Sequence, residues 1–372
     1  MTFATPERPV YVVGGGPAGL ATAIAMRLEG LPVKVADCAH PPIDKSCGEG
    51  LMPDTISTLK TLGVELPENA GYPLKGITFI DNNRTVTADF SSSLARGLRR
   101  TALHELLIRR AREVGVELLW GARVERVSGT SIVIDGREYK AAYVIGADGQ
   151  NSRIRRDAGL SPAHFEQTRY GFRRHYRIAP WSNYVQLYWG NKCQLYVTPV
   201  APDEVGVALI SDDPHLRMDG GLAQFPPLRK RLEHVEHASK EMGSITASRN
   251  LRNVRRTNIA LVGDASGSVD AITGEGMSLA FQQALALAAA CKAGDLFQYE
   301  LTHRELRQRP GVMAGSMLLL ARHEELRRRA FASLSRRPEM FRQLLAVHIG
   351  ESSFKDLLSW RLLPLSAAFL TA

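Results

Sequence analysis

The stretch Val10-Tyr11-Val12-Val13-Gly14-Gly15-Gly16-Pro17-Ala18-Gly19 places an apolar segment directly before a run of glycines. Residues 20–28 follow, rich in Ala, Leu, Ile and Met as in a buried helix, and residues 33–36 read as a second strand that ends at Asp37. A strand, a glycine turn, a helix and a second strand within about thirty residues form a β-α-β unit, which is typical of nucleotide-binding folds.

The glycines of this turn have separate expected roles. Gly14 permits the tight turn, Gly16 lets the backbone approach a pyrophosphate, and Gly19 allows the helix to pack closely on the strand. Pro17 and Ala18 open the helix, whose free N–H groups would meet the diphosphate. The pattern therefore predicts a dinucleotide site, and a glycine turn with a purely structural role is the alternative.

The acid that ends the second strand supports the dinucleotide interpretation. Asp37 lies where a carboxylate accepts hydrogen bonds from an adenosine ribose and disfavours a 2′-phosphate. Strand, turn, helix, strand and acid occur in the required order. That context is more specific than a glycine pattern alone.

Two later segments bear on which dinucleotide is bound. The segment Gly146-Ala147-Asp148-Gly149-Gln150-Asn151-Ser152-Arg153 resembles the Asp-Gly motif of flavoprotein hydroxylases. Gly263-Asp264-Ala265-Ser266, together with Gly274-Glu275-Gly276-Met277, resembles their Gly-Asp motif. With the first fingerprint, these motifs resemble the p-hydroxybenzoate hydroxylase-fold superfamily of FAD-dependent oxidoreductases over about residues 8 to 295.

The resemblance implies that FAD is the cofactor and that NADPH or NADH is a transient co-substrate. Asp264 follows an apolar strand and would bind a ribitol hydroxyl, while the helix after Gly274 would direct its positive end at the flavin pyrimidine. Arg100 is implied to reach the FAD diphosphate, with a surface charge as the alternative. Beyond the fingerprint and Asp37, the expected cofactor-binding residues are Arg100, Asp148, Gly263, Asp264, Gly274, Gly276 and Met277.

The loop Lys45-Ser46-Cys47-Gly48-Glu49-Gly50-Leu51-Met52-Pro53 bears on the reaction. Its Gly-Leu-x-Pro part looks like the flavin-flanking loop of aromatic hydroxylases, whereas Cys47-Gly48 and Thr273-Gly274-Glu275-Gly276 look like the geranylgeranyl reductases of the same superfamily. Cys47 is the candidate catalytic residue, and a small buried thiol is the alternative. The Trp-x-Trp-x-Ile-Pro signature of the related halogenases is missing.

The leading functional prediction is an FAD-dependent monooxygenase of secondary metabolism that hydroxylates a lipophilic small molecule, with phenols among the candidates, using NAD(P)H and O2. The runner-up is a flavin reductase of isoprenoid double bonds, and a non-catalytic FAD redox protein is a third hypothesis. Arg173, Arg174 and Arg177 could hold an acidic substrate group, but we favour a solvated strand face for them.

Composition excludes several other classes. The four cysteines lack metal-ligand spacing, no run of residues is apolar enough to span a bilayer, and the N-terminal residues do not form a signal peptide, which together favour a cytoplasmic protein. The net charge of +9 comes without a nucleic-acid-binding motif, so nucleic acid is not expected as a partner. A homodimer and a peripheral membrane contact of the basic, apolar C-terminus, including residues 354–370, stay open.

The expected fold class is α/β, with three parts. A discontinuous Rossmann-like FAD-binding domain takes residues 1–75, 98–165 and 250–295. An inserted β-sheet substrate domain takes residues 76–97 and 166–249, where aromatic residues and prolines become frequent. A helical segment takes residues 296–372, which are rich in arginine.

Overall fold

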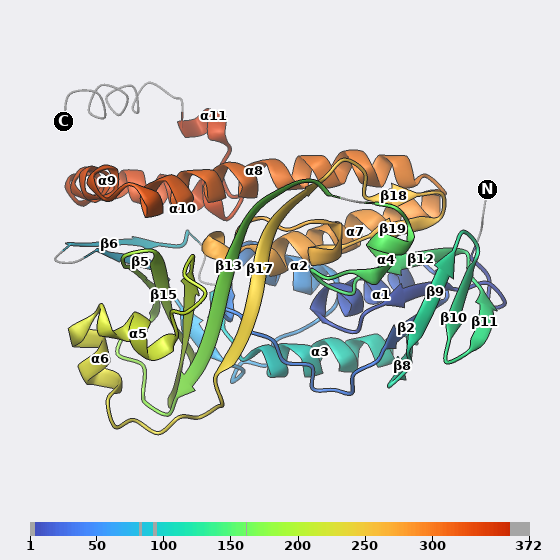
Figure 1. The fold of residues 1–372 in the computed structure, drawn as a ribbon, viewed down its shortest axis with the longest axis horizontal. Coiled ribbons are helices and arrows are strands. Elements are labelled where there is room, and N and C mark those ends of the chain that lie inside the picture. The colour runs from blue at the N-terminus through green and yellow to red at the C-terminus, as the bar shows by residue number, and fades with distance from the viewer. Residues whose placement is uncertain (1–3, 82–83, 92–94, 161, 358–372) are drawn as a thin grey trace.

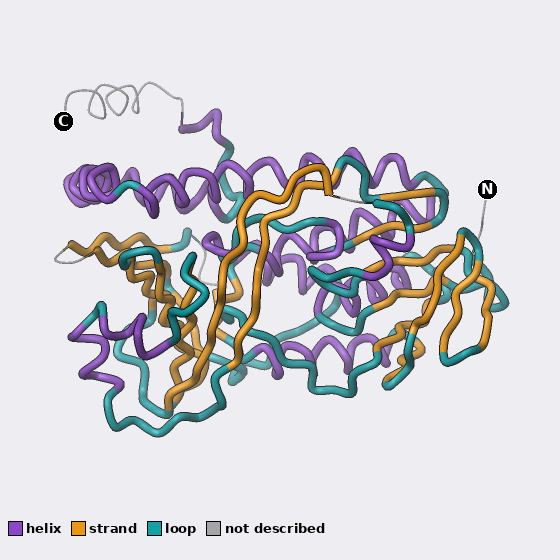
Figure 2. The backbone as a smooth tube through the Cα atoms, viewed as in Figure 1, coloured by secondary structure: helices purple, strands orange, loops and turns teal. Residues whose placement is uncertain are grey.

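The computed structural model describes residues 4–81, 84–91, 95–160 and 162–357. Figures 1 and 2 show two large sheets placed side by side, with a layer of C-terminal helices running along both of them. This α/β architecture confirms the expected fold class.

The first large sheet is built on the N-terminal strand. Its strand order is β18-β19-β12-β1-β2-β8, and β1 lies at its centre, paired in parallel with β2 and β12. Parallel pairing continues outward to β8 and β19, and β18 is the antiparallel edge. The strands are β1 (Val10–Val13), β2 (Val33–Asp37), β8 (Glu117–Trp120), β12 (Tyr143–Gly146), β18 (Arg255–Arg256) and β19 (Ile259–Leu261).

Helices rich in small residues cover this sheet. Helix α1 packs against both α3 and α7, and its Leu20, Ile24 and Met26 side chains are fully buried. Parallel strands that are covered in this way are buried throughout, as the all-apolar β1 shows. The helices and turns of this part are α1 (Pro17–Leu28), α2 (Pro53–Thr61), α3 (Arg100–Glu113), α4 (Arg153–Asp157), α7 (Gly276–Ala293), η1 (Gly263–Ser266) and η2 (Ala271–Thr273).

The structure also has two small sheets, of which the one formed by β3, β4 and β7 contacts β15 of the second large sheet. Strands β9 (Val124–Ser128), β10 (Ser131–Ile134) and β11 (Arg137–Lys140) form an antiparallel meander, in which Asp135 and Gly136 make the β10–β11 turn with positive φ angles. Strand β7 (Ala95–Gly97) pairs with β3 (Gly50–Leu51) and β4 (Tyr72–Leu74). The latter sheet anchors the loop that precedes β3.

The second large sheet has the strand order β17-β13-β16-β15-β14-β5-β6. It is antiparallel except where β14 runs parallel to β5, so residues from before α3 and from after α4 share one sheet. Its strands are β5 (Gly76–Asp81), β6 (Arg84–Asp89), β13 (Pro162–Tyr176), β14 (Tyr184–Trp189), β15 (Cys193–Ala201), β16 (Glu204–Ser211) and β17 (Met242–Leu251). Helices α5 (Met218–Ala223) and α6 (Pro226–Leu232) cover its far side.

The C-terminal helices connect the two sheets. Helix α8 (Leu296–Arg322) contacts α7 and β18 at one end and continues toward α9 (Glu324–Arg336) and α10 (Pro338–His348), which pack on β6 (Figure 1). The rings of Phe79 and Phe331 stack across this contact, and a buried ion pair joins Arg327 to Asp81 at 3.2 Å. A short helix, α11 (Phe354–Leu357), follows.

The helix expected over residues 20–28 is α1, which begins three residues earlier at Pro17, whereas one expectation about the strand arginines is wrong. Arg173 is not solvated: it is 1% exposed, because it faces the loop before β3 instead of water. Arg177, which is exposed, does fit the solvated interpretation. Most of the expected membrane-contacting tail, residues 358–370, lies outside the described residues, and no helix within the described ranges is long and apolar enough to cross a membrane.

Candidate active site

The glycine turn after β1 has the geometry of a phosphate cradle. Gly14 has a φ of +112°, and a Cβ added there would overlap the carbonyl of Ala147; one added to Gly19 would overlap the carbonyl of Gly14. Around Gly16, by contrast, no described atom lies within 4 Å of an added Cβ. Gly14 and Gly19 thus allow close packing, while Gly16 leaves free space at the N-terminus of α1, where a diphosphate would lie.

The acids Asp37 and Asp148 make local backbone contacts. Asp37 accepts the N–H of Gly15 at 2.6 Å and that of Ala39 at 2.8 Å, which fastens the glycine turn to the end of β2. Asp148 accepts the N–H of Arg153 at 2.6 Å and so caps α4. Neither acid lines the main cavity, and their roles toward the cofactor stay predictions.

A single cavity of about 800 Å³ joins the glycine turn to the second sheet and the C-terminal helices. Its wall includes most of the residues that the sequence marks as cofactor-binding. These are Gly16, Pro17, Ala18, Arg100, Gly263, Asp264, Gly274, Gly276 and Met277. The candidate catalytic residue Cys47 lines the same cavity, whereas Gly14, Gly19, Asp37 and Asp148 stand behind it.

Arg100 begins α3 and reaches the wall of the cavity. Its Nε atom is buried and has no hydrogen-bond partner in the part of the chain that the structure describes. A buried guanidinium nitrogen without a partner loses its hydration without compensation, so an anion beside it would be stabilising. This observation fits a cofactor diphosphate, the role that the sequence predicts for Arg100.

Another wall is formed where η1 meets α1. Gly263 has a φ of +59°, and an added Cβ would lie 2.8 Å from the Cβ of Ala18, so glycine lets the two elements approach. The next residue, Asp264, pairs with Lys45 Nζ at 3.0 Å across the cavity wall. The carboxylate and the ammonium group together offer an acceptor and a donor to a polyhydroxyl chain.

The N-terminus of α7 completes the polar end of the cavity. Gly274 has a φ of +70°, and neither Gly274 nor Gly276 has a described atom within 4 Å of an added Cβ. The backbone is therefore accessible at the positive end of an 18-residue helix. Such a helix end stabilises negative charge that develops on a bound group.

The loop before β3 is held by a buried ion network. Glu49 is 2% exposed and adopts a φ of +60°, which is strained for a residue with a side chain. Its Oε1 accepts the Arg100 backbone N–H and a guanidinium N–H of Arg173, both at 2.9 Å, and its Oε2 lies 2.5 Å from His175 Nε2. Arg173 also makes two bonds to Asp44, at 2.7 and 3.0 Å.

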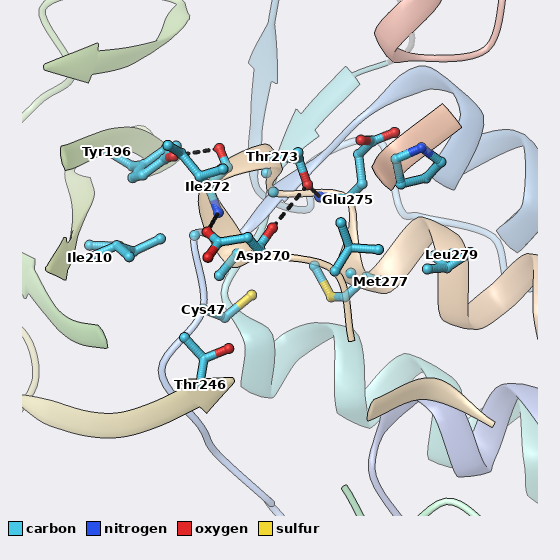
Figure 3. A pocket seen from close by; sticks show the side chains of 18 of the residues that line it. Cys47, Tyr196, Ile210, Thr246, Asp270, Ile272, Thr273, Glu275, Met277 and Leu279 are labelled. Carbon is cyan, nitrogen blue, oxygen red and sulfur yellow. Dashed lines mark hydrogen bonds between the residues drawn. The ribbon is translucent and has the colours of Figure 1, made fainter. Parts of the chain in front are cut away.

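This network has an electrostatic consequence for Asp44. Burial raises the pKa of Asp44, but the hydrogen bonds from Arg173 and its positive charge outweigh burial, so the pKa lies below its ordinary value. Arg173 of β13 thus holds the loop through ion pairs with Asp44 and Glu49. Cys47 lies within it, half-buried, and its Sγ accepts the N–H of Glu49 at 3.4 Å. Figure 3 shows Cys47 on the same pocket as Met277 and Thr246.

A second polar cluster lies where α7 begins, close to α8 and α10. Glu275 is 5% exposed; its carboxyl lies 3.4 Å from His348 Nδ1 and 3.6 Å from Arg309 Nη2. Burial, with some help from the charge of Asp54, raises the pKa of Glu275 to about 8, although Arg309 opposes the shift. Burial and the charge of Arg309 lower the pKa of His348 to about 4. Burial thus favours the neutral form of both side chains.

The remainder of the cavity is apolar. Tyr196 lies at its edge and donates its hydroxyl to the carbonyl of Ile272 at 2.6 Å, which ties β15 to η2 (Figure 3). Side chains from the second sheet and from α8, α9 and α10 form the opposite wall. They include Ile77, Phe79, Leu187, Met317, Leu320, Phe331, Leu334, Phe341 and Leu345.

Comparison with known proteins identifies the class to which this fold and site belong. Residues 7–219, more than half of the chain, match the family described as "FAD binding domain", and the chain belongs to that family. The resemblance to the p-hydroxybenzoate hydroxylase-fold superfamily is confirmed. The protein is thus an FAD-dependent oxidoreductase.

Individual relatives point to two kinds of chemistry. The menaquinone reductase of Mycobacterium tuberculosis (strain H37Rv) is 26% identical over 323 residues, which cover 77% of each chain. The 3-(3-hydroxy-phenyl)propionate/3-hydroxycinnamic acid hydroxylase of Mycobacterium sp. (strain JLS) is 30% identical over 172 residues, 42% of this chain and 30% of that protein. Among solved structures, a flavoprotein/dehydrogenase from Cytophaga hutchinsonii superposes with a TM-score of 0.83 at 19% identity, over 97% of this chain and 98% of that one.

Sequence reasoning missed the polar groups that the fold gathers at this site. Glu49 received no role from its place in the loop, because its joint contact with Arg100 and Arg173 requires the β13 register. For Glu275 the sequence offered one indication of a buried role, since an acid between two glycines at a helix start is unusual for a purely solvated position. His348 carried none, because α10 reaches the cavity only through tertiary packing.

Proposed function

We propose that this protein is an FAD-dependent monooxygenase that hydroxylates a lipophilic small molecule, with phenols as the first class to test and NAD(P)H and O2 as co-substrates. The observation that carries the proposal is the continuous cavity, which has a polar cradle at one end and an apolar chamber at the other. Oxygen insertion by a flavin needs a site that excludes water and holds an apolar substrate beside the cofactor.

The residues of the cavity fit FAD. Gly16 and Arg100 would hold its diphosphate, and Asp264 with Lys45 would hold its ribityl chain. When bound, FAD supplies the electron transfer from NAD(P)H to dioxygen. The chain itself positions the substrate against apolar side chains, excludes water, and places the N-terminus of α7 where negative charge is favoured.

The mycobacterial hydroxylase supports the choice of hydroxylation, because it shares 30% identity over 172 residues and its name describes action on phenolic acids. The apolar chamber supports a lipophilic substrate. A charged phenolic acid is less favoured, since Arg173, the buried cation nearest the loop, is already paired with two carboxylates.

The test is aerobic turnover of the FAD-loaded protein with candidate phenols under isotopically labelled dioxygen. We expect one labelled oxygen atom in the product for each NAD(P)H consumed, and unlabelled water as solvent should contribute none. If no label enters any product while an alkene is reduced anaerobically, the monooxygenase proposal is wrong.

A second candidate function is reduction of an isoprenoid-type double bond. It is favoured by the exposure of Cys47 to the cavity and by the relation to the menaquinone reductase along 77% of the chain. Anaerobic incubation with an isoprenoid quinone and NAD(P)H tests it. Retained alkene reduction in a Cys47→Ala variant would remove the thiol from that reaction.

Some expectations about the cellular setting also stay proposals. They are a homodimer, a cytoplasmic location, a role in secondary metabolism, and a peripheral membrane contact of the C-terminal tail. Pelleting of the full chain with anionic vesicles, compared with a chain that ends at residue 353, tests the membrane contact.

A further inference from the structure

Glu275 and His348 hold unused hydrogen-bonding capacity at the wall of the cavity. Glu275 is 5% exposed and His348 is 6% exposed, and both line the cavity wall. Both carboxyl oxygens of Glu275, and Nδ1 of His348, are buried without a hydrogen-bond partner among the described residues. Buried polar atoms are satisfied in most proteins, so three such atoms on one wall point to a ligand group that completes them.

The neighbouring groups do not satisfy these atoms. Arg309 directs Nη1 at the backbone carbonyls of Val347 and His348, and its Nη2 lies 3.6 Å from Glu275 and 3.7 Å from Asp54. Asp54 accepts the Ser278 hydroxyl at 2.5 Å. Arg309 therefore holds the end of α10 against α8, and it limits, but does not cancel, the preference of Glu275 for its neutral form.

The protonation states make the pair complementary to a hydroxyl group. A neutral Glu275 carries an O–H donor, since burial raises its pKa to about 8. His348 is neutral, and its ring also hydrogen-bonds to the backbone of Thr273, so the unpartnered Nδ1 can act as an acceptor. The carboxyl and Nδ1 are 3.4 Å apart, close enough for one oxygen atom to contact both.

The surroundings define the rest of the ligand. The lining residues contributed by α8, α10 and α11 include the apolar Pro310, Met313, Leu344, Leu345 and Phe354. Figure 3 shows that the carboxyl of Glu275 points away from Cys47 and Met277. The polar pair thus lies apart from the side of the cavity where the cofactor-flanking loop stands.

We propose that Glu275 and His348 form a polar subsite that binds the hydroxyl group of an otherwise lipophilic aromatic alcohol, with the hydroxyl oxygen accepting from Glu275 and its hydrogen donated to His348. The subsite rests on the proposed function, for which it names the substrate class, and it fixes which end of the substrate faces away from Cys47.

The test measures binding without turnover. The FAD-loaded protein is titrated by calorimetry at pH 7, without NAD(P)H and without dioxygen, with 2-naphthol and with naphthalene. Because naphthalene is the more hydrophobic compound, the decisive quantity is the ratio of the two dissociation constants and its change between variants. We expect this ratio to shift at least tenfold against 2-naphthol in Glu275→Met and in His348→Leu.

Two further variants control the experiment. Glu275→Gln keeps a donor at this position and should restore most of the discrimination. Glu300→Gln alters an equally buried glutamate on α8 that contacts the backbone N–H of Val254 and does not line the cavity, so it should leave the ratio unchanged. Retention of FAD by each variant shows that the fold is intact.

The outcomes separate the subsite from the proposed function. An unchanged ratio in Glu275→Met and His348→Leu would overturn the subsite, and so would the absence of any binding of 2-naphthol. If discrimination depends on the pair but no labelled oxygen enters a product, the subsite stands and the monooxygenase proposal fails.

Discussion

Replacing Glu49 by alanine should destabilise the protein far more than the loss of one surface charge. The carboxylate accepts three hydrogen bonds, from the Arg100 backbone, Arg173 and His175, and all of its partners but the backbone are almost fully buried. In the variant Arg173 stays buried with Asp44 as its remaining partner in this network. A buried cation would then be only half compensated.

The magnitude follows from these contacts. Removing one partner of a buried ion pair costs about 3–5 kcal/mol, and we take the lower end because Asp44 still binds Arg173. The backbone N–H of Arg100 loses its acceptor, which adds about 1 kcal/mol. We expect Glu49→Ala to lower the free energy of unfolding by about 4 kcal/mol, and Glu49→Gln, which keeps an acceptor of the same shape, by roughly half as much.

Urea denaturation of the cofactor-free protein measures this loss, with the slope of the transition as a check that the unfolded states are comparable. Glu325→Gln is the matched control, because Glu325 also binds two arginines but does so in solvent, where such pairs contribute little. FAD affinity should fall in Glu49→Ala, since Glu49 holds the first residue of α3. A loss of stability no larger than that of Glu325→Gln would refute the reasoning.

Three further predictions concern other parts of the site. Gly16→Val should leave the fold intact but lower FAD affinity at least a hundredfold in a fluorescence titration, because its side chain enters the free space where the diphosphate would lie. Gly19→Val should instead unfold the protein, since its Cβ would overlap the Gly14 carbonyl. An equal loss of stability in both variants would contradict this prediction. Glu275 keeps its proton in the folded state and loses it in the unfolded state between about pH 4.5 and about pH 8, so the free energy of unfolding of the unaltered protein should fall by about 4 kcal/mol relative to that of Glu275→Gln over this range, as followed by denaturation of both proteins at each pH; parallel pH profiles would show that Glu275 is ionised. Cys47→Ala should leave hydroxylation within about threefold of the unaltered protein if the monooxygenase proposal holds, because no proton or electron passes through the thiol in that reaction, and rates of NAD(P)H oxidation and product formation measure this.

The nucleotide-binding unit could be predicted because its constraints are local. Gly14, Gly16 and Gly19 act within one turn, and the positions of their Cβ atoms depend on neighbours a few residues away or on the adjacent strand. The same holds for the N-termini of α3 and α7, where Arg100 and Gly276 occupy the expected places. Backbone geometry of this kind restricts the residue type, so it can be predicted from the sequence.

The polar networks could not be predicted, because they depend on register and packing between distant segments. Arg173 looked like one of three arginines on an exposed strand, and only the pairing of β13 with β16 turns it toward Glu49 and buries it. His348 follows Glu275 by more than seventy residues and meets it through the packing of α10. The type of a charged residue does not indicate which face of a strand or helix it will occupy.

The central position of β1 has a consequence for the synthesis of the protein. Strand β1 is made before the rest of its sheet, which gains β12 only after residue 146 and β19 only after residue 261, and the cavity wall also needs Phe354 of α11. During synthesis the residues of the glycine turn are therefore available before those of the apolar part of the cavity. Contacts of such long sequence separation form slowly, and a cofactor that binds the partly folded chain stabilises the glycine turn while the rest of the cavity forms.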